Sequence, residues 1–270
     1  MKAPAYSLAA LLAITSLCGS VIAAPLAPHR AVYDIKLKRA ADRTGIESIR
    51  GRMVFDFNGS ACEGFTTRYR FVMEIDGGGE KRITDQQTAT HEDGDGGAFS
   101  FSTRNFVNSV LDGEIRGHAT AQPHALSVEL SKPREAAFEL PQGHFPTSHL
   151  LELIERAGKN ETQYETAVFD GSDDANAVLT TSVFISRLAT PAAEDPEKKA
   201  LGILGADRFW PVSVAYFVPG SSEGDAVPLY RIDFKLHDNG VTRDLLMDYG
   251  DYTLAGQLID LKLFDPPACR

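Results

Sequence analysis

The segment FTTRYRFVMEI at residues 65–75 alternates apolar and charged side chains. One set of alternate positions holds the apolar residues Phe65, Tyr69, Phe71, Met73 and Ile75. The other set holds the charged residues Arg68, Arg70 and Glu74. Because successive side chains of a strand point to opposite faces of its sheet, this period of two predicts a half-buried β-strand.

The same period recurs along the rest of the chain, and clusters of Gly, Asn, Asp and Pro separate the repeats. The further alternating segments are residues 31–37, 53–57, 126–130, 179–185, 212–218, 230–236 and 241–249. Together they predict an all-β protein. Asn239-Gly240 lies between the last two segments, and it favours an antiparallel hairpin with a type I′ turn.

One segment, residues 147–157, has a helical period instead. Ser148 or Thr147 is expected to cap its first amides, and Gly158 to take the left-handed position that ends it. One face of this helix is apolar, so we expect it to pack against the sheet, on the concave side. That face consists of Leu150, Leu153, Ile154 and Ala157.

The first 23 residues have the three parts of a secretory signal peptide. Lys2 precedes a short apolar stretch, and Val21-Ile22-Ala23 predicts cleavage after Ala23. Cys18 lacks the small preceding residue of a lipoprotein cysteine, so no lipid anchor is expected. No other apolar stretch is long enough to span a membrane. We therefore predict a periplasmic protein with a single domain over residues 24–270.

Removal of the signal peptide leaves two cysteines, Cys62 and Cys269. Disulfides persist in oxidising compartments such as the periplasm, so we expect these two residues to form one. One alternative is a pair of buried thiols. Another is that Cys62 acts as a thiolate nucleophile, which would leave Cys269 without a role.

Composition and motifs give no enzymatic signature. The chain has 27 basic and 37 acidic residues, a balance that argues against a nucleic-acid partner. It contains no Gly-x-Ser-x-Gly elbow and no phosphate-binding or dinucleotide-binding glycine pattern. We therefore expect no catalytic activity and no cofactor.

Candidate metal ligands are also poorly spaced. His144 and His149 miss the i, i+4 spacing that places two ligands on one helical face. The acidic clusters at residues 92–95 and 170–174 lack the spacing of a calcium loop, and solvated turns are the expectation for both, with calcium as the alternative. The charged segment TPAAEDPEKK at residues 190–199 is likewise predicted to be an exposed loop.

Several strands carry large aromatic side chains. Phe99-Ser100-Phe101, Trp210-Pro211-Val212 and Tyr216-Phe217 supply wide apolar faces. In a closed sandwich these faces would form the core. In an open curved sheet they could instead line a groove for an acyl chain or a partner peptide.

Five segments together resemble one known family. They are GSACEGF at 59–65, FPTSHL at 145–150, FDG at 169–171, WPVSVAYF at 210–217 and NGVTRDLLMDYGDY at 239–252. In this order, and closing with Cys269, they resemble the EipB-like β-spiral proteins, an alphaproteobacterial periplasmic family with a domain of unknown function. The charged loop at 194–199 is the one departure.

The resemblance implies a β-spiral: antiparallel strands wound into a broken barrel with one packed helix. It also implies a disulfide between Cys62 and Cys269, and a shape similar to lipoprotein carriers. The function expected from it is non-enzymatic support of cell-envelope integrity through protein or lipid contacts. The partner would be a periplasmic envelope protein, for example of the tetratricopeptide type, or a lipid. The alternatives are a lipid or lipoprotein carrier with an apolar groove, and a hydrolase of envelope polymers.

Overall fold

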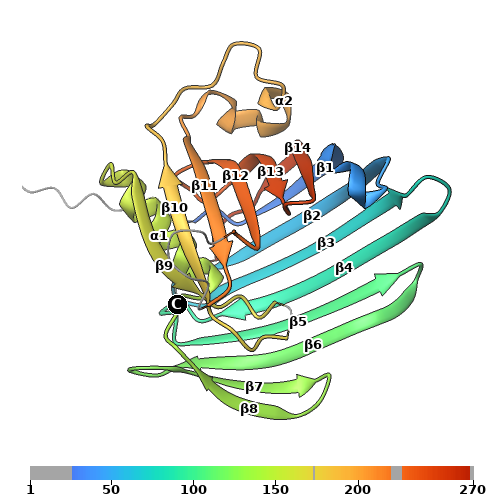
Figure 1. Ribbon diagram of the computed structural model, residues 1–270. Coiled ribbons are helices and arrows are strands. Elements are labelled where there is room, and N and C mark those ends of the chain that lie inside the picture. Colours follow the sequence, from blue (N-terminus) through green and yellow to red (C-terminus); the bar gives the residue numbers. More distant parts are fainter. Residues whose placement is uncertain (1–25, 173, 220–226, 268–270) are drawn as a thin grey trace, which may run out of the picture.

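The structure is a computed structural model that describes residues 26–172, 174–219 and 227–267. Within these residues the chain forms one antiparallel sheet of 14 strands that curls around a helix (Figure 1). The predicted signal peptide and Cys269 lie outside the described residues. No described helix has the length and apolar composition needed to cross a bilayer.

The strands follow one another along the sheet in two meanders. The first meander consists of β1 (His29–Ala40), β2 (Ser48–Ser60), β3 (Gly64–Asp76), β4 (Lys81–Glu92), β5 (Ala98–Val107), β6 (Val110–Ala121), β7 (Leu126–Lys132) and β8 (Ala136–Leu140). The second consists of β9 (Gln163–Val168), β10 (Leu179–Ile185), β11 (Trp210–Phe217), β12 (Tyr230–Leu236), β13 (Thr242–Asp248) and β14 (Tyr252–Leu263). The all-β prediction is therefore confirmed.

The first and last strands join the two meanders. Strand β1 pairs with β14, with Ile35 opposite Gly256, so the sheet order is β8 through β1, then β14 through β9. The outer strands β8 and β9 are the edges of this sheet. The segment after β8 approaches the end of β9 at one point, where the His144 amide donates to Ala167 O (2.7 Å) and the Phe169 amide donates to His144 O (2.9 Å). The result is the predicted broken barrel, curled but not closed by a continuous ladder.

The predicted hairpin at Asn239-Gly240 forms, but with a different turn. Strands β12 and β13 pair antiparallel, and the Gly240 amide donates to His237 O at 3.0 Å. Only Gly240 has a positive φ, 85°, so the type I′ prediction is wrong. The geometry is that of a type I turn followed by a left-handed glycine. Both central residues have positive φ in another hairpin, at Asn108 (49°) and Ser109 (68°) between β5 and β6.

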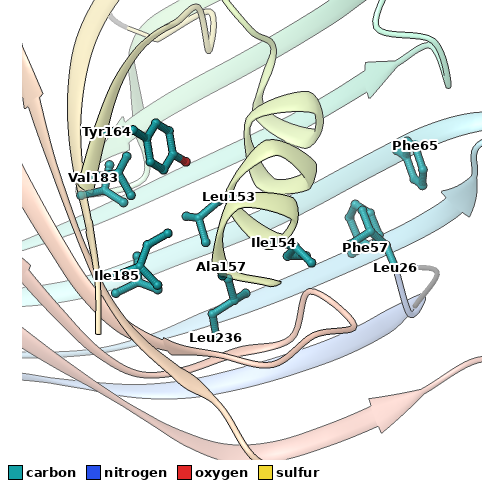
Figure 2. Close-up of a cluster of buried hydrophobic side chains, with 12 residues drawn as sticks. Leu26, Phe57, Phe65, Leu153, Ile154, Ala157, Tyr164, Val183, Ile185 and Leu236 are labelled. Atoms are coloured by element: carbon teal, nitrogen blue, oxygen red, sulfur yellow. The ribbon is translucent and has the colours of Figure 1, made fainter. Parts of the chain in front are cut away.

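Helix α1 (Pro146–Gly158) occupies the concave side of the sheet, as predicted (Figure 1). Leu153, Ile154 and Ala157 are buried in one core cluster with residues of both meanders. Figure 2 shows Ile154 directed towards Phe57 and Leu153 towards Val183. The helix therefore joins the two arms of the sheet through apolar contacts and fills part of the barrel interior.

Both predicted helix caps are wrong. Neither Thr147 nor Ser148 caps the helix with its side chain; Phe145 is the N-cap residue, and Pro146 opens the helix. The first amides bind Glu92 of β4 instead: the Thr147 amide donates to Oε2 at 2.7 Å and the Ser148 amide to Oε1 at 2.8 Å. At the other end Asn160, with φ 60°, takes the left-handed position predicted for Gly158. Asn160 fits because its short polar side chain tolerates that conformation.

The prediction of a solvated turn at residues 92–95 is wrong for Glu92, because this side chain is only 2% exposed. We expect Glu92→Ala to lower the free energy of unfolding by roughly 2 kcal/mol, because two buried amides lose their acceptor. Glu92→Gln keeps an acceptor but removes the charge that favours a helix N-terminus, so it should cost less, about 1 kcal/mol. Urea unfolding of the two variants tests the order of these effects, and equal losses would contradict it.

The charged segment at 190–199 is exposed at most of its residues, as predicted, but Asp195 and Glu197 are buried. It leads into the short helices α2 (Lys198–Leu201) and η2 (Gly202–Ala206); the third short helix, η1 (Asp42–Thr44), follows β1. Asp195 and Glu197 are 9% and 2% exposed and bind Arg243, which has no exposed surface. Glu197 also accepts the Leu258 amide of β14 at 2.6 Å. The segment is therefore attached to the sheet by buried charges.

Candidate functional site

A cleft of about 440 Å³ lies on the concave face beside the first turn of α1. Side chains of β2 to β6 form one side of it, and β11 and β12 supply residues on the other. The lining is completed by Pro146, Thr147, His149 and Leu150 of the helix, by Val168 of β9, and by Asp170 and Ser172 after β9. The cleft is the part of the barrel interior that α1 does not fill.

Aromatic rings form much of the lining. Tyr216 and Tyr230, from β11 and β12, stack with ring centroids 4.4 Å apart and an angle of 18° between their planes. The row continues beyond the cleft through Tyr249, 6.2 Å from Tyr230, to Tyr252. Burial raises the pKa of Tyr216 and of Tyr230, so both phenols stay neutral at physiological pH. We call Tyr216, Tyr230, Tyr249 and Tyr252 the tyrosine row.

Polar side chains of β4 and β5 line the cleft as well. Thr88 and Thr103 are cross-strand neighbours whose hydroxyls are 2.9 Å apart, and the Tyr69 hydroxyl also bonds Thr88. Gln86, Thr90 and Asn105 extend this polar surface. We call Tyr69, Thr88 and Thr103 the hydroxyl row. The cleft thus combines aromatic faces with closely spaced hydrogen-bonding groups.

The lining carries little charge. Among its described residues there is no Lys or Arg, and the one carboxylate is Asp170, whose Oδ1 accepts the Ser172 amide at 2.9 Å. Burial lowers the pKa of His149 to about 4, so its ring is neutral at physiological pH. His149 is 7% exposed, and its Nε2 has no hydrogen-bond partner among the described residues.

The residues singled out from the sequence are dispersed in the structure. Cys62 lies in the turn between β2 and β3, and its predicted partner Cys269 lies outside the described residues, so the disulfide stays a prediction. His144 contacts Glu152 at 3.4 Å, away from the cleft. Phe99 and Phe101 belong to the core, where Phe99 stacks with Phe145 and Phe101 meets Phe169 edge to face. The described residues contain no group of three or more His, Cys, Asp or Glu able to hold a metal ion.

Sequence reasoning found one side of the cleft and missed the other. Tyr216 belongs to a predicted aromatic strand, and a groove was one of the two interpretations offered for it. The polar lining was missed because β4 reads TDQQTAT over residues 84–90, with no apolar face to reveal a strand. Polar residues at every second position, 86, 88 and 90, were the available signal.

The comparisons with known proteins agree with this architecture. The sequence profile described as EipB-like matches residues 20–265. The chain belongs to the EipB-like family. A relative, the cell envelope integrity protein EipB of Brucella abortus (strain 2308), is 46% identical over 241 residues, covering 89% of this chain and 85% of the relative.

A crystal structure from Brucella abortus is also similar to this EipB-like chain. It is described as a β-barrel-like protein of a domain of unknown function. The sequence identity is 45%, the TM-score is 0.86, and the match covers 89% of this chain and 99% of the other. The open, curled sheet is therefore shared with a solved member of similar size.

Proposed function

We propose that this EipB-like protein supports the integrity of the cell envelope from the periplasm, as a binding protein without enzymatic activity. The observation that carries the proposal is the concave cleft, which offers aromatic and hydrogen-bonding groups and little charge. The name of the Brucella relative supports the envelope role. A single domain closed by a Cys62–Cys269 disulfide belongs to the same proposal.

The structure favours binding over the two alternatives. A carrier of acyl chains needs an apolar groove, but α1 fills part of the interior, and an acyl chain in the remaining cleft would bury the hydroxyl row and neighbouring amides without replacing their bonds to water. Unpaired burial of such groups is unfavourable. A hydrolase of envelope glycans uses two carboxyl groups, whereas the described lining contains only Asp170.

Thr103→Trp should block the cleft and abolish function in cells. Thr103 points into the cleft, and an indole there occupies the space beside Thr88. In a strain lacking the gene, we expect the variant to accumulate but fail to restore resistance to detergent and to cell-wall antibiotics. Growth under these agents, with immunoblots of periplasmic extracts, gives the readout.

Ser102→Trp is the matched control. Ser102 is the preceding residue of β5, and alternation places its side chain on the outer face of the sheet. This variant should restore resistance fully. If Thr103→Trp restores resistance as well as Ser102→Trp does, the cleft is not the acting surface and the proposal fails. If the unmodified protein captures a tetratricopeptide-type protein and Thr103→Trp does not, the ligand of the cleft is a protein.

A further inference from the structure

The charges around the cleft exclude an anionic ligand group. Phosphate and carboxylate are bound by Arg, Lys or free helix N-terminal amides. The described lining has no Arg or Lys, and the α1 amides of Thr147 and Ser148 are already bound by Glu92. Asp170 would repel a second negative charge. The ligand that fits is therefore neutral where it contacts the cleft.

The hydrogen-bonding groups require a ligand rich in polar atoms. The hydroxyl oxygens of Thr88 and Thr103 are 2.9 Å apart, and hydroxyls both donate and accept hydrogen bonds. Filling the cleft with hydrocarbon would deprive the amides of Gln86 and Asn105, and the remaining hydrogen-bonding capacity of the Thr88–Thr103 pair, of water without a substitute. A ligand with closely spaced hydroxyl or amide groups would satisfy them.

The tyrosine row supplies the complementary apolar contact. Tyr216 and Tyr230 stack nearly in parallel, and Tyr230 is followed by Tyr249 at 6.2 Å. An aromatic face carries partial negative charge and attracts the weakly positive hydrogens of C–H groups. Pyranose rings with equatorial substituents present such C–H groups on their faces and hydroxyls at their edges. Both surfaces of the cleft are then matched by one kind of molecule.

From these contacts we infer that the cleft binds a neutral oligosaccharide of β-linked pyranose units, with sugar faces on Tyr216 and Tyr230 and hydroxyls on Thr88 and Thr103. The inference rests on the proposed function and specifies its ligand. Rings outside the cleft, Tyr249 and Tyr252, continue the row. The inferred sugar contacts lie within the cleft and do not extend to these two rings.

Calorimetric titration of the full mature protein tests the inference with four probes: chitotetraose, cellotetraose, palmitate and inorganic phosphate. We expect saturable binding of at least one oligosaccharide and none of palmitate or phosphate. Binding of chitotetraose alone points to glycans with N-acetyl groups, and binding of cellotetraose to glucose polymers. Either result supports the inference.

Substitutions at three positions locate the binding. Tyr230→Ala should weaken oligosaccharide binding roughly tenfold or more, while Tyr230→Phe, which keeps the ring, should retain it within roughly threefold. Valine has a shape similar to that of threonine but lacks the hydroxyl, so Thr88→Val should also weaken binding roughly tenfold. Tyr252→Ala, in the same row but outside the cleft, is the matched control and should bind normally. Urea unfolding confirms that each variant is folded.

Several outcomes would overturn the inference. Binding of palmitate with neither oligosaccharide would make the occupant an acyl chain. Binding of no probe would reject the sugar assignment, while the proposed function would still be judged separately by Thr103→Trp in cells. Oligosaccharide binding that is unchanged in Tyr230→Ala and Thr88→Val would place the sugar elsewhere on the protein and would also overturn it.

Discussion

Arg243→Met should lower the free energy of unfolding by about 3–5 kcal/mol, the usual cost of removing one partner from a buried ion pair. Arg243 has no exposed surface, and its Nη1 lies 2.9 Å from Asp195 and 3.1 Å from Glu197. Methionine fills a similar volume but leaves the buried Glu197 without its cation and Asp195 with only Lys235, whose Nζ is 3.9 Å away. Urea unfolding followed by circular dichroism measures the change.

The rest of the network explains why the loss should be large. Arg243 Nε donates to His237 Nε2 at 3.2 Å, and the guanidinium lies 4.7 Å from the Phe209 ring centroid. Burial, followed by the nearby Arg243 charge, lowers the pKa of His237, which keeps the ring neutral and able to accept this bond. Burial raises the pKa of Glu197, although the Leu258 amide and Arg243 oppose that shift. Loss of the cation therefore leaves only the backbone amides of Leu258 and Asp244 to offset the cost of burying Glu197.

Two variants separate the buried pair from a general effect of losing arginine. Arg43→Met removes the exposed partner of Asp251, and it should leave the unfolding curve nearly unchanged. The triple variant Arg243→Met, Asp195→Asn, Glu197→Gln removes the charges together and should recover most of the lost stability. A single Arg243→Met variant as stable as Arg43→Met would show that the network contributes little.

The same network contains contacts that could not be predicted from the sequence. The segment at 190–199 is charged and contains prolines, and such composition is typical of exposed loops. Two of its side chains, Asp195 and Glu197, are nevertheless buried, and their burial depends on Arg243, more than forty residues later and itself within a strand. Glu92 is similar, since it caps a helix that begins 54 residues further on. Local patterns cannot predict these contacts because both partners are polar and only the fold brings them together.

Strands were predictable where one face is apolar throughout. The segments at 179–185 and 230–236 have the same limits as β10 and β12. The period of two is lost in β4, because its concave residues Gln86, Thr88 and Thr90 line the cleft instead of the core. Alternation of apolar residues thus failed to predict the strand whose concave face lines the candidate site instead of packing in the core. Such failures are expected at sites where function competes with stability.

The predicted Cys62–Cys269 disulfide should contribute roughly 2–5 kcal/mol, so Cys62→Ser or Cys269→Ser should lower the melting temperature by roughly 5–15 °C. The bond would close a loop of about 208 residues, and restriction of the unfolded chain by a loop of this length gives about 5 kcal/mol as an upper value. Thermal melts with and without reductant measure the effect.

The sheet register is compatible with this bond. His29 of β1 lies opposite Phe57 of β2 on one side and Leu263 of β14 on the other. The end of β14 and the turn that holds Cys62 are therefore at the same end of the sheet, separated by about two strand spacings of roughly 5 Å each. Cys269 follows Leu263 by six residues, a chain length that can cover such a separation.

The bond would attach the end of β14 to the β2–β3 turn across β1, the strand at which the two meanders meet. Its loss should therefore weaken the junction between the two arms more than either arm alone, and protease cleavage should increase in the residues after β14. Reductant should lower the melting temperature of the unmodified protein but not that of the Cys62→Ser, Cys269→Ser double variant. Equal melting temperatures with and without reductant, together with two free thiols by mass analysis of the mature protein, would show that the bond does not form.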